Sequence, residues 1–301
     1  MKKTCVIIAG PTAVGKTALA IEIAQHFSTK IISADSRQCY KELNIAVAKP
    51  SPGELKKVQH YFIDTIRVNE DFSAADFETY ALHAVNEIFT RNDIAVMVGG
   101  TGLYIKAFCG GLDEIPAVDE TVRKDIIKNY EEHGIAFLQE EIKKADPAFF
   151  KTGEMQNPQR MIRALEVQLS TGISITTFQS RQKKQRSFNI IKIGLELPRE
   201  ILYQRINERV DKMMDEGLVA EAQQLIPYKK LNALQTVGYR ELFDYFGNKI
   251  DLQRAIELIK QNTRHYAKRQ LTWFKRDGEL TWCPPVKEEV LRIIDNCIRR
   301  F

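Results

Sequence analysis

The sequence predicts an α/β protein, with a P-loop NTPase-like parallel sheet flanked by helices and a smaller all-helical insertion domain. Three observations support this prediction. Across residues 1–110, short β-type runs alternate with helical patterns, which is the rhythm of a parallel sheet. A phosphate-binding motif directly follows the first of these runs. From Asp119 the pattern turns helical, until a β-branched run returns at Phe188.

The first part of the chain supplies the alternating elements of the core. Its apolar runs predict strands, and its helical periodicities predict the helices between them. In chain order we expect strand Thr4–Ala9, helix Thr17–His26, strand Lys30–Ser33, helix Ala74–Arg91 and strand Ile94–Val98. Gly110, Gly111 and Pro116 then end this block.

The middle of the chain is expected to form the insertion. Its periodicities predict helices over Glu120–Glu132, Ile135–Ala145 and Pro158–Ser170. The run Phe188–Leu195 should rejoin the sheet, and helices follow at 199–216, 251–275 and 287–300. These patterns place the α/β core with its C-terminal helices at residues 1–112 and 190–301, and the helical insertion domain at residues 113–189.

Composition excludes several classes of protein. The 301 residues are 44% hydrophobic and 28% charged, as in an ordinary globular protein of about two domains. Apolar runs such as Ile94–Val98 fall far short of the ~20 residues that cross a bilayer. The five cysteines are scattered and never spaced C-x-x-C, which favours a cytoplasmic protein. Without an apolar heptad pattern, we expect a monomer.

The phosphate-binding motif fits G-x-x-x-x-G-K-[ST] in full, between a hydrophobic strand and an apolar-periodic helix. It consists of Gly10, Pro11, Thr12, Ala13, Val14, Gly15, Lys16 and Thr17. Such a loop curls backbone N–H groups around phosphate oxygens, while its lysine supplies charge and its hydroxyl binds Mg²⁺. We therefore expect Thr17 to be a magnesium ligand. The alternative is a glycine-rich turn with a chance Lys-Thr pair.

A carboxylate and a hydroxyl follow two other expected strands. Asp35 comes after Lys30–Ser33, whereas Ile94–Val98 runs into a glycine-rich turn that contains Thr101 and no carboxylate. Ligands bind at the carboxyl ends of parallel strands, so both side chains should converge on the phosphate site. Asp35 could act there as a base. Alternatively, Asp35 caps a turn and the Thr101 hydroxyl satisfies one.

Two basic segments favour a nucleic-acid partner over an ordinary solvated surface. One carries Arg160, Arg163, Arg181, Lys183, Lys184 and Arg186. In the other, Lys260, Arg264 and Lys268 are spaced four apart and should form one stripe, with aromatic residues among them. Arg205 and Arg209, also four apart, could close over the phosphate site or form surface ion pairs.

Together these motifs resemble the tRNA dimethylallyltransferases, also called tRNA isopentenyltransferases, of the bacterial type. The resemblance runs along most of the chain, and the ordered set of motifs is far more specific than the phosphate-binding loop alone. The matching segments are Gly10–Thr17, Asp35–Gln38 with Tyr40, Ala48–Pro50, Val98–Ile105, Val122 with Arg123, Gln159–Val167, Val237–Tyr239 and Thr263–Phe274. The chain departs from many members at Ala46 and Val47, where they carry Gly-Thr.

The resemblance implies an activity. A member of this family transfers a dimethylallyl group from dimethylallyl diphosphate to N6 of the adenine that lies 3′ of the anticodon, and releases diphosphate. Asp35 matches the general base, because adenine N6 is a poor nucleophile that must lose a proton. The P-loop would hold the diphosphate with Lys16, Arg209 and Mg²⁺, and Thr101 would lie near the bridging oxygen of the donor. Binding of a nucleotide such as ATP stays open.

The partner implied by the resemblance is tRNA, bound through its anticodon stem-loop. The positions that match tRNA contacts are Asp35, Ser36, Arg37, Gln38, Thr101, Arg123, Gln159, Arg160, Met161, Ile162 and Arg163. Arg264 and Lys268 join them from the basic stripe. The target base must be flipped out of its stack to reach the donor, at a cost of a few kcal/mol.

Two other functions fit parts of the sequence. A small-molecule kinase would also carry a P-loop, a strand-end aspartate and lid arginines, but would not need the basic aromatic segment around residues 260–276. A non-catalytic, nucleotide-gated RNA-binding protein would leave Asp35 without a task.

Overall fold

The computed structural model describes residues 2–179 and 182–300. The chain divides into two compact units. The core unit comprises residues 1–111 and 185–301, and the helical unit comprises residues 112–184. Arg181, which the sequence placed in a basic segment, lies outside the described residues.

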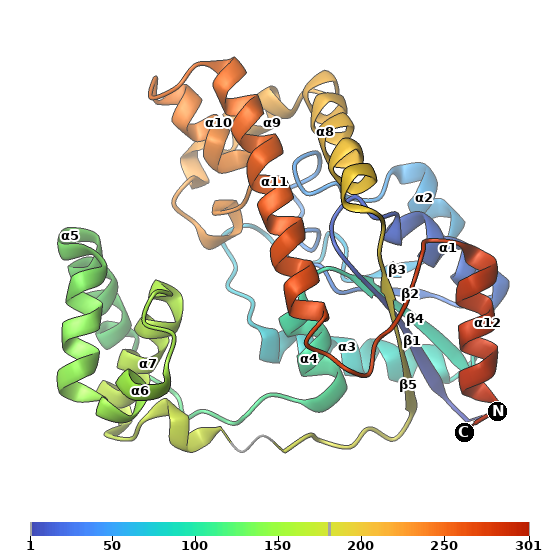
Figure 1. Cartoon of the computed structure of the whole chain (residues 1–301), viewed down its shortest axis with the longest axis horizontal. Coiled ribbons are helices and arrows are strands. Elements are labelled where there is room, and N and C mark those ends of the chain that lie inside the picture. The colour runs from blue at the N-terminus through green and yellow to red at the C-terminus, as the bar shows by residue number, and fades with distance from the viewer. Residues whose placement is uncertain (1, 180–181, 301) are drawn as a thin grey trace. The chain divides into compact units, whose positions relative to one another are not determined.

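The core unit contains the parallel sheet that the sequence predicts (Figure 1). Its strands pair in the order β3-β2-β4-β1-β5-β6, and neighbouring strands run parallel to one another. The strands are β1 Thr4–Ala9, β2 Ile31–Ser33, β3 His60–Tyr61, β4 Ile94–Gly99, β5 Asn189–Leu195 and β6 Thr281–Cys283.

Strand β1 lies in the middle of the sheet and is buried on both faces. Cys5 and Ile7 belong to the apolar cluster on one face, and Val6 and Ile8 belong to the cluster on the other. A strand covered on both faces reads as a continuous apolar run. This is why the first six-residue strand is visible in the sequence with its correct bounds.

Helices cover both faces of the sheet. Those of the core unit are α1 Lys16–His26, α2 Pro52–Lys57, α3 Ala74–Phe89, α4 Gly102–Gly110, α8 Arg199–Asp215, α9 Leu218–Gln224, α10 Tyr239–Phe246, α11 Leu252–Phe274 and α12 Lys287–Ile298. Helices α1 and α12 supply residues to one cluster, while α3, α4, α9 and α10 supply the other. Short 3₁₀ turns lie at Ile226–Tyr228 and Asn232–Leu234.

The register of the sheet brings three strand ends to one level. Ala9 of β1 pairs with Gly99 of β4, and Ser33 of β2 pairs with Val98 of β4. The residues that follow these strands therefore emerge side by side at the carboxyl edge. This is the edge where open parallel sheets bind their ligands.

The helical unit contains α5 Glu120–Ala145, α6 Pro147–Thr152 and α7 Pro158–Thr171, followed by a 3₁₀ turn at Ile175–Phe178. Its core includes Leu138, Ile142 and Leu165. Helix α5 is interrupted at Gly134, whose φ of 72° is not helical. The two helices that the sequence predicts across this region therefore meet at that residue.

The elements that the sequence did not predict are short. Strands β3 and β6 and helices α2 and α6 have six residues or fewer, too few to show a period. Helix α4 was also missed, because its first residues belong to the glycine-rich turn after β4.

Arg186 has a structural role that its place in a basic segment does not suggest. Its Nε donates to Phe108 O at 2.7 Å, and its Nη2 donates to Ala107 O at 2.8 Å, so it caps the last turn of α4. The same Nη2 pairs with Glu78 of α3 at 2.8 Å, and both side chains are nearly buried. Arg186 therefore joins two helices and is not available to a polyanion.

We expect Arg186→Ala to lower the free energy of unfolding of the core unit by about 3 kcal/mol, because Glu78 would remain as an unpaired buried charge. Both tryptophans, Trp273 and Trp282, belong to the core unit, so fluorescence during urea unfolding reports on that unit. Lys184→Ala is the control, since the pair of Lys184 with Glu114 is exposed. Equal effects of the two substitutions would contradict the assignment.

Candidate active site

The phosphate-binding motif forms the turn between β1 and α1. Gly15 adopts φ 105°, a conformation that costs glycine least, and it directly precedes Lys16, the first helical residue. Gly15 has no side chain with which to cap the helix. The first N–H groups of α1 are therefore open to an anion, which the helix dipole also favours.

Two cations lie at this turn. Lys16 Nζ donates to Pro11 O at 2.7 Å, and Arg209 Nη1 of α8 lies 3.4 Å from Thr12 Oγ1. Burial lowers the pKa of Lys16 to about 7, Asp35 opposes this shift and Arg209 adds to it. Burial also lowers the pKa of Arg209. An anion bound at this loop would favour the charged form of Lys16, so the lysine and Arg209 together suit an anion site.

Asp35 follows β2 and fills one of the two roles that the sequence left open, that of capping a turn. Its Oδ1 accepts the backbone N–H groups of Arg37 at 2.9 Å and Gln38 at 3.3 Å, so it caps a turn. Asp35 also lines the cavity beside Lys16. Because only Oδ1 takes part in these bonds, the orientation of the carboxylate is fixed while Oδ2 remains for another partner.

Thr101 ties the turn after β4 to the turn after β2. Its Oγ1 accepts the N–H of Ser36 at 3.0 Å, and its own N–H donates to Ala34 O at 3.1 Å. A Cβ on Gly99 would lie 2.1 Å from Ala34 O, so only glycine permits this approach. Thr101 lies next to Asp35 in this way, although it is not among the residues that line the cavity.

Gln270 of α11 is a site residue that the sequence did not single out. It is nearly buried, its Oε1 accepts the N–H of Thr12 at 2.8 Å, and its Nε2 donates to Gly100 O at 2.9 Å. Gln270 therefore joins the phosphate-binding turn to the turn after β4. Its place inside the matched segment Thr263–Phe274 was the only signal in the sequence.

A cavity of about 270 Å³ lies over these strand ends. Its polar lining includes Lys16, Thr17, Asp35, Arg209 and Gln270. Its apolar lining includes Ala46, Val47, Val210, Met213, Val237 and Ile259, which all belong to or pack against one apolar cluster of the core. The cavity thus offers an anion site and an apolar wall to a single ligand.

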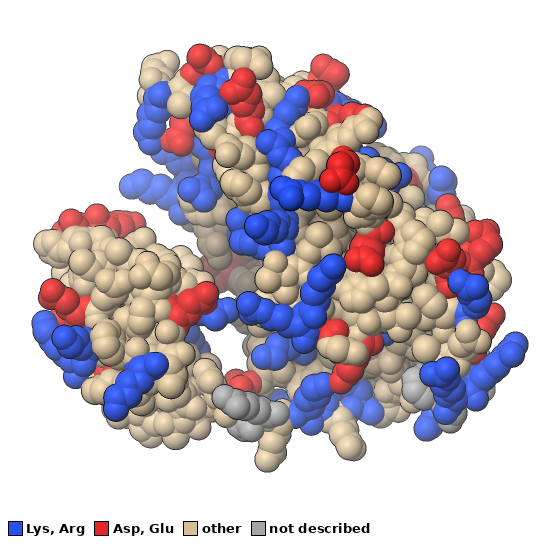
Figure 2. All heavy atoms as spheres, in the orientation of Figure 1, with Lys and Arg blue, Asp and Glu red and all other residues tan. Residues whose placement is uncertain are grey.

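The basic stripe on α11 is only partly free. Lys260 pairs with Asp211 of α8, and Arg264 Nη1 donates to Asn207 Oδ1 at 2.6 Å, also on α8. Lys268 is exposed and forms no ion pair with a described residue. Lysine and arginine side chains gather along the viewed face of α11 (Figure 2). The three cations lie along one face of α11, as their spacing predicts, but the first two also hold α11 against α8.

The predicted RNA-contacting residues of the helical unit fall into three groups. Gln159 and Arg160 are exposed. Arg123 and Arg163 both donate through Nη1 to the fully buried carboxylate of Glu166 and keep part of their surface in water. The side chains of two further residues lie in the core of the unit: Met161 and Ile162. Because these side chains pack inside the unit, they do not reach its surface to contact RNA.

Neither a cluster of metal ligands nor a helix that could span a membrane is found among the described residues. Across residues 2–179 and 182–300, no three His, Cys, Asp or Glu side chains are grouped closely enough to hold a metal ion. Thr17, the predicted magnesium ligand, lines the cavity. None of the helices in the described ranges has the length and apolar character needed to span a membrane.

Comparison with known proteins identifies the family. The family model described as IPP transferase matches residues 38–277. The tRNA dimethylallyltransferase of Christiangramia forsetii is 49% identical over 282 residues, covering 94% of this chain and 93% of that protein. The tRNA dimethylallyltransferase 1 of Bacteroides thetaiotaomicron is 45% identical over 292 residues, covering 97% and 95%.

Solved structures agree. The tRNA isopentenylpyrophosphate transferase of Bacillus halodurans matches with a TM-score of 0.71 at 35% identity, covering 99% of this chain and 96% of that one. A eukaryotic dimethylallyltransferase described as acting on tRNA matches with a TM-score of 0.78 at 26% identity, covering 95% and 75%. The resemblance found in the sequence is thus confirmed: the chain belongs to the IPP transferase family and is a transferase.

Proposed function

We propose that the protein transfers a dimethylallyl group from dimethylallyl diphosphate to N6 of the adenine 3′-adjacent to the anticodon in tRNA, releasing diphosphate. The observation that carries this proposal is that an anion site, a carboxylate and an apolar wall meet in one cavity. The curated relatives, named tRNA dimethylallyltransferases, support the same reaction.

The diphosphate of the donor would bind at the turn between β1 and α1. The open N–H groups of α1, Lys16 and Arg209 together offer hydrogen bonds and positive charge to its oxygens. These groups are fixed before the reaction, so they stabilise the charge that grows on the departing diphosphate more than they stabilise the bound donor.

Mg²⁺ fits this site through Thr17. The ion commonly keeps several waters and takes its remaining ligands from substrate phosphates, so one protein hydroxyl beside the diphosphate is a sufficient donor set. Thr17 lies in the cavity, one residue into α1, where that hydroxyl is needed. When bound, the metal would supply further positive charge to the leaving diphosphate.

Asp35 would accept the proton of adenine N6. The amine is a weak nucleophile, so a base must remove its proton as the new carbon–nitrogen bond forms. The two backbone N–H groups that bind Oδ1 hold the carboxylate in place. The hydrogen bonds of Thr101 join the turn after β4 to the turn after β2, which carries Asp35. Thr101 would therefore help to position the donor beside Asp35.

The apolar wall separates this reaction from phosphoryl transfer. A small-molecule kinase places a polar acceptor next to its phosphate site and has no use for a wall that includes Val210, Met213 and Ile259. A short hydrocarbon attached to a diphosphate matches both parts of the cavity.

Each unit would contribute separately to tRNA binding. The core unit offers Asp35, Ser36, Arg37 and Gln38 around the base to be modified, and Lys268 toward the phosphate backbone. The helical unit offers four polar side chains that reach water: Arg123, Gln159, Arg160 and Arg163. Contacts of this kind offset the cost of flipping the base.

We expect Asp35→Asn to lower kcat by about 10²- to 10⁴-fold, because the amide cannot accept the proton. The amide oxygen can still accept the N–H groups of Arg37 and Gln38, so the turn and the affinity for tRNA should persist. Mass spectrometry of digested tRNA measures prenylated adenosine, and filter binding measures affinity. A variant that kept full turnover would falsify the assignment of the base.

We expect Lys268→Ala to weaken tRNA binding and to reduce the slope of log K against log salt by about 0.7 to 0.9, the value for one lost phosphate contact. Lys260→Ala is the matched control on the same helix, since Lys260 is held by Asp211. Its slope should stay at the wild-type value. Equal slopes for all three proteins would mean that Lys268 is merely solvated.

A further inference from the structure

One wall of the cavity is a loop that carries few regular backbone bonds of its own. Ala46, Val47 and Ala48 of this loop line the cavity. The loop, residues 44–49, follows the turn after β2 and precedes α2. It is held by three polar side chains: Glu221 and Gln38 come from outside the loop, and Lys49 is its last residue.

Glu221 of α9 holds the beginning of the loop. Its carboxylate accepts the N–H groups of Asn44 at 3.2 Å, Ile45 at 2.8 Å and Ala46 at 3.2 Å. The hydroxyl of Tyr239 donates to Glu221 Oε1 at 2.7 Å. Burial and the adjacent carboxylate raise the pKa of the fully buried Tyr239, so this hydroxyl keeps its proton and remains a donor.

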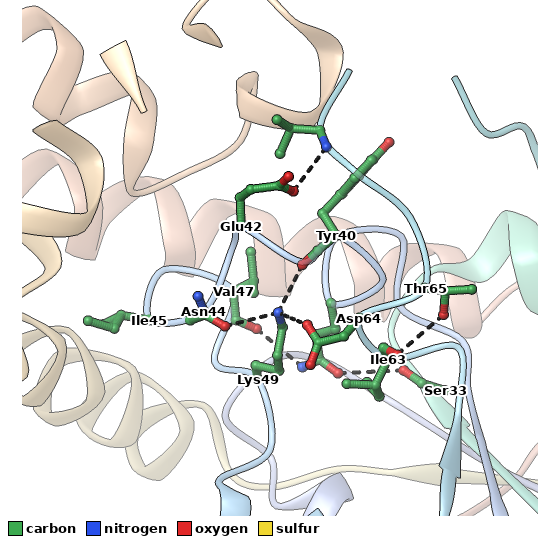
Figure 3. A network of polar contacts seen from close by, with 12 residues as sticks. Ser33, Tyr40, Glu42, Asn44, Ile45, Val47, Lys49, Ile63, Asp64 and Thr65 are labelled. Carbon is green, nitrogen blue, oxygen red and sulfur yellow. Dashed lines mark hydrogen bonds and ion pairs between the residues drawn. The ribbon is translucent and has the colours of Figure 1, made fainter. Parts of the chain in front are cut away.

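The side chains of Lys49 and Gln38 hold the remaining part of the loop. Lys49 Nζ donates to Tyr40 O at 2.8 Å and to Asn44 Oδ1 at 3.0 Å, and it pairs with Asp64 (Figure 3). Gln38 Nε2 donates to Val47 O at 3.2 Å and to Ala48 O at 3.0 Å. The residues of the loop are therefore anchored one after another.

This anchoring makes the wall resistant to displacement. A flexible loop could move outward to admit a longer ligand, at a small cost in energy. Here outward movement would break the charge-assisted hydrogen bonds that the Glu221 carboxylate accepts from three backbone N–H groups. The width of the apolar part of the cavity is therefore fixed.

We propose that Glu221 is a positioning residue that fixes this wall and thereby makes the enzyme select a five-carbon allylic diphosphate over longer ones. The inference rests on the proposed function, because it concerns the donor of that reaction. Glu221 touches no reacting atom and acts through Ala46 and Val47. The selection is steric, since the side chains of a fixed wall exclude the extra carbons of a longer chain.

The test compares dimethylallyl diphosphate with the ten-carbon geranyl diphosphate at saturating tRNA. We expect Glu221→Ala to raise KM for dimethylallyl diphosphate. The ratio of kcat/KM for dimethylallyl diphosphate to kcat/KM for geranyl diphosphate should fall by about tenfold, which is within the range of discrimination that extra methylenes cause in an apolar pocket. Glu221→Gln should restore part of the ratio, because its carbonyl oxygen can still accept N–H groups. Tyr239→Phe should lower the ratio less, since the carboxylate remains.

Glu216→Gln is the control: Glu216 forms an exposed ion pair with Lys212, so this substitution should leave the ratio unchanged. A loss of folded protein lowers kcat for both donors equally, so an unchanged ratio in Glu221→Ala overturns the inference, whatever its stability. If the wild-type protein transfers neither group to tRNA, the proposed function itself fails. If it transfers dimethylallyl while all variants keep its ratio, only the role of Glu221 fails.

Discussion

The site depends on the close contact between the carboxyl ends of β2 and β4. Gly99 has no room for a side chain beside Ala34, and the N–H of Thr101 donates to the same Ala34 carbonyl. This contact sets the position of Asp35 on one side and of the turn with Thr101 on the other. Gln270 then connects that turn to the phosphate-binding loop. A phosphate site and a carboxylate meet in one cavity because these backbones touch.

The sequence was most informative where one local pattern determines the structure. The strand Thr4–Ala9, the phosphate-binding turn and the placement of Asp35 after a strand all follow from neighbouring residues. Gln270 and Glu221 could not be found in this way. Their partners Thr12 and Asn44 lie far away in the chain, and a single glutamine or glutamate on a helix looks like any solvated residue.

Charge is where the sequence was least reliable. A search of the sequence for basic segments treats every lysine and arginine alike. In the folded protein, however, several of them form ion pairs with acidic side chains of the same chain. Arg186 joins α3 to α4, Lys260 joins α8 to α11, and Glu166 binds two arginines of the helical unit. The surface that remains for a polyanion is smaller and more localised than the sequence indicates. Glu78 and Asp211, which pair with Arg186 and Lys260, lie far from them in the chain, and Glu166 lies inside the basic segment itself.

The order of the strands also bears on how the chain is made. Strand β1 pairs with β5, which begins at Asn189, and the whole helical unit lies between them in sequence. During synthesis β1 therefore keeps one unpaired edge until the ribosome has passed Leu195. The helical unit, whose contacts are local, is complete before that moment. An unpaired edge of an apolar strand can pair with other chains and cause aggregation. We therefore expect the nascent chain to be most prone to aggregation while residues 112–195 are being synthesised.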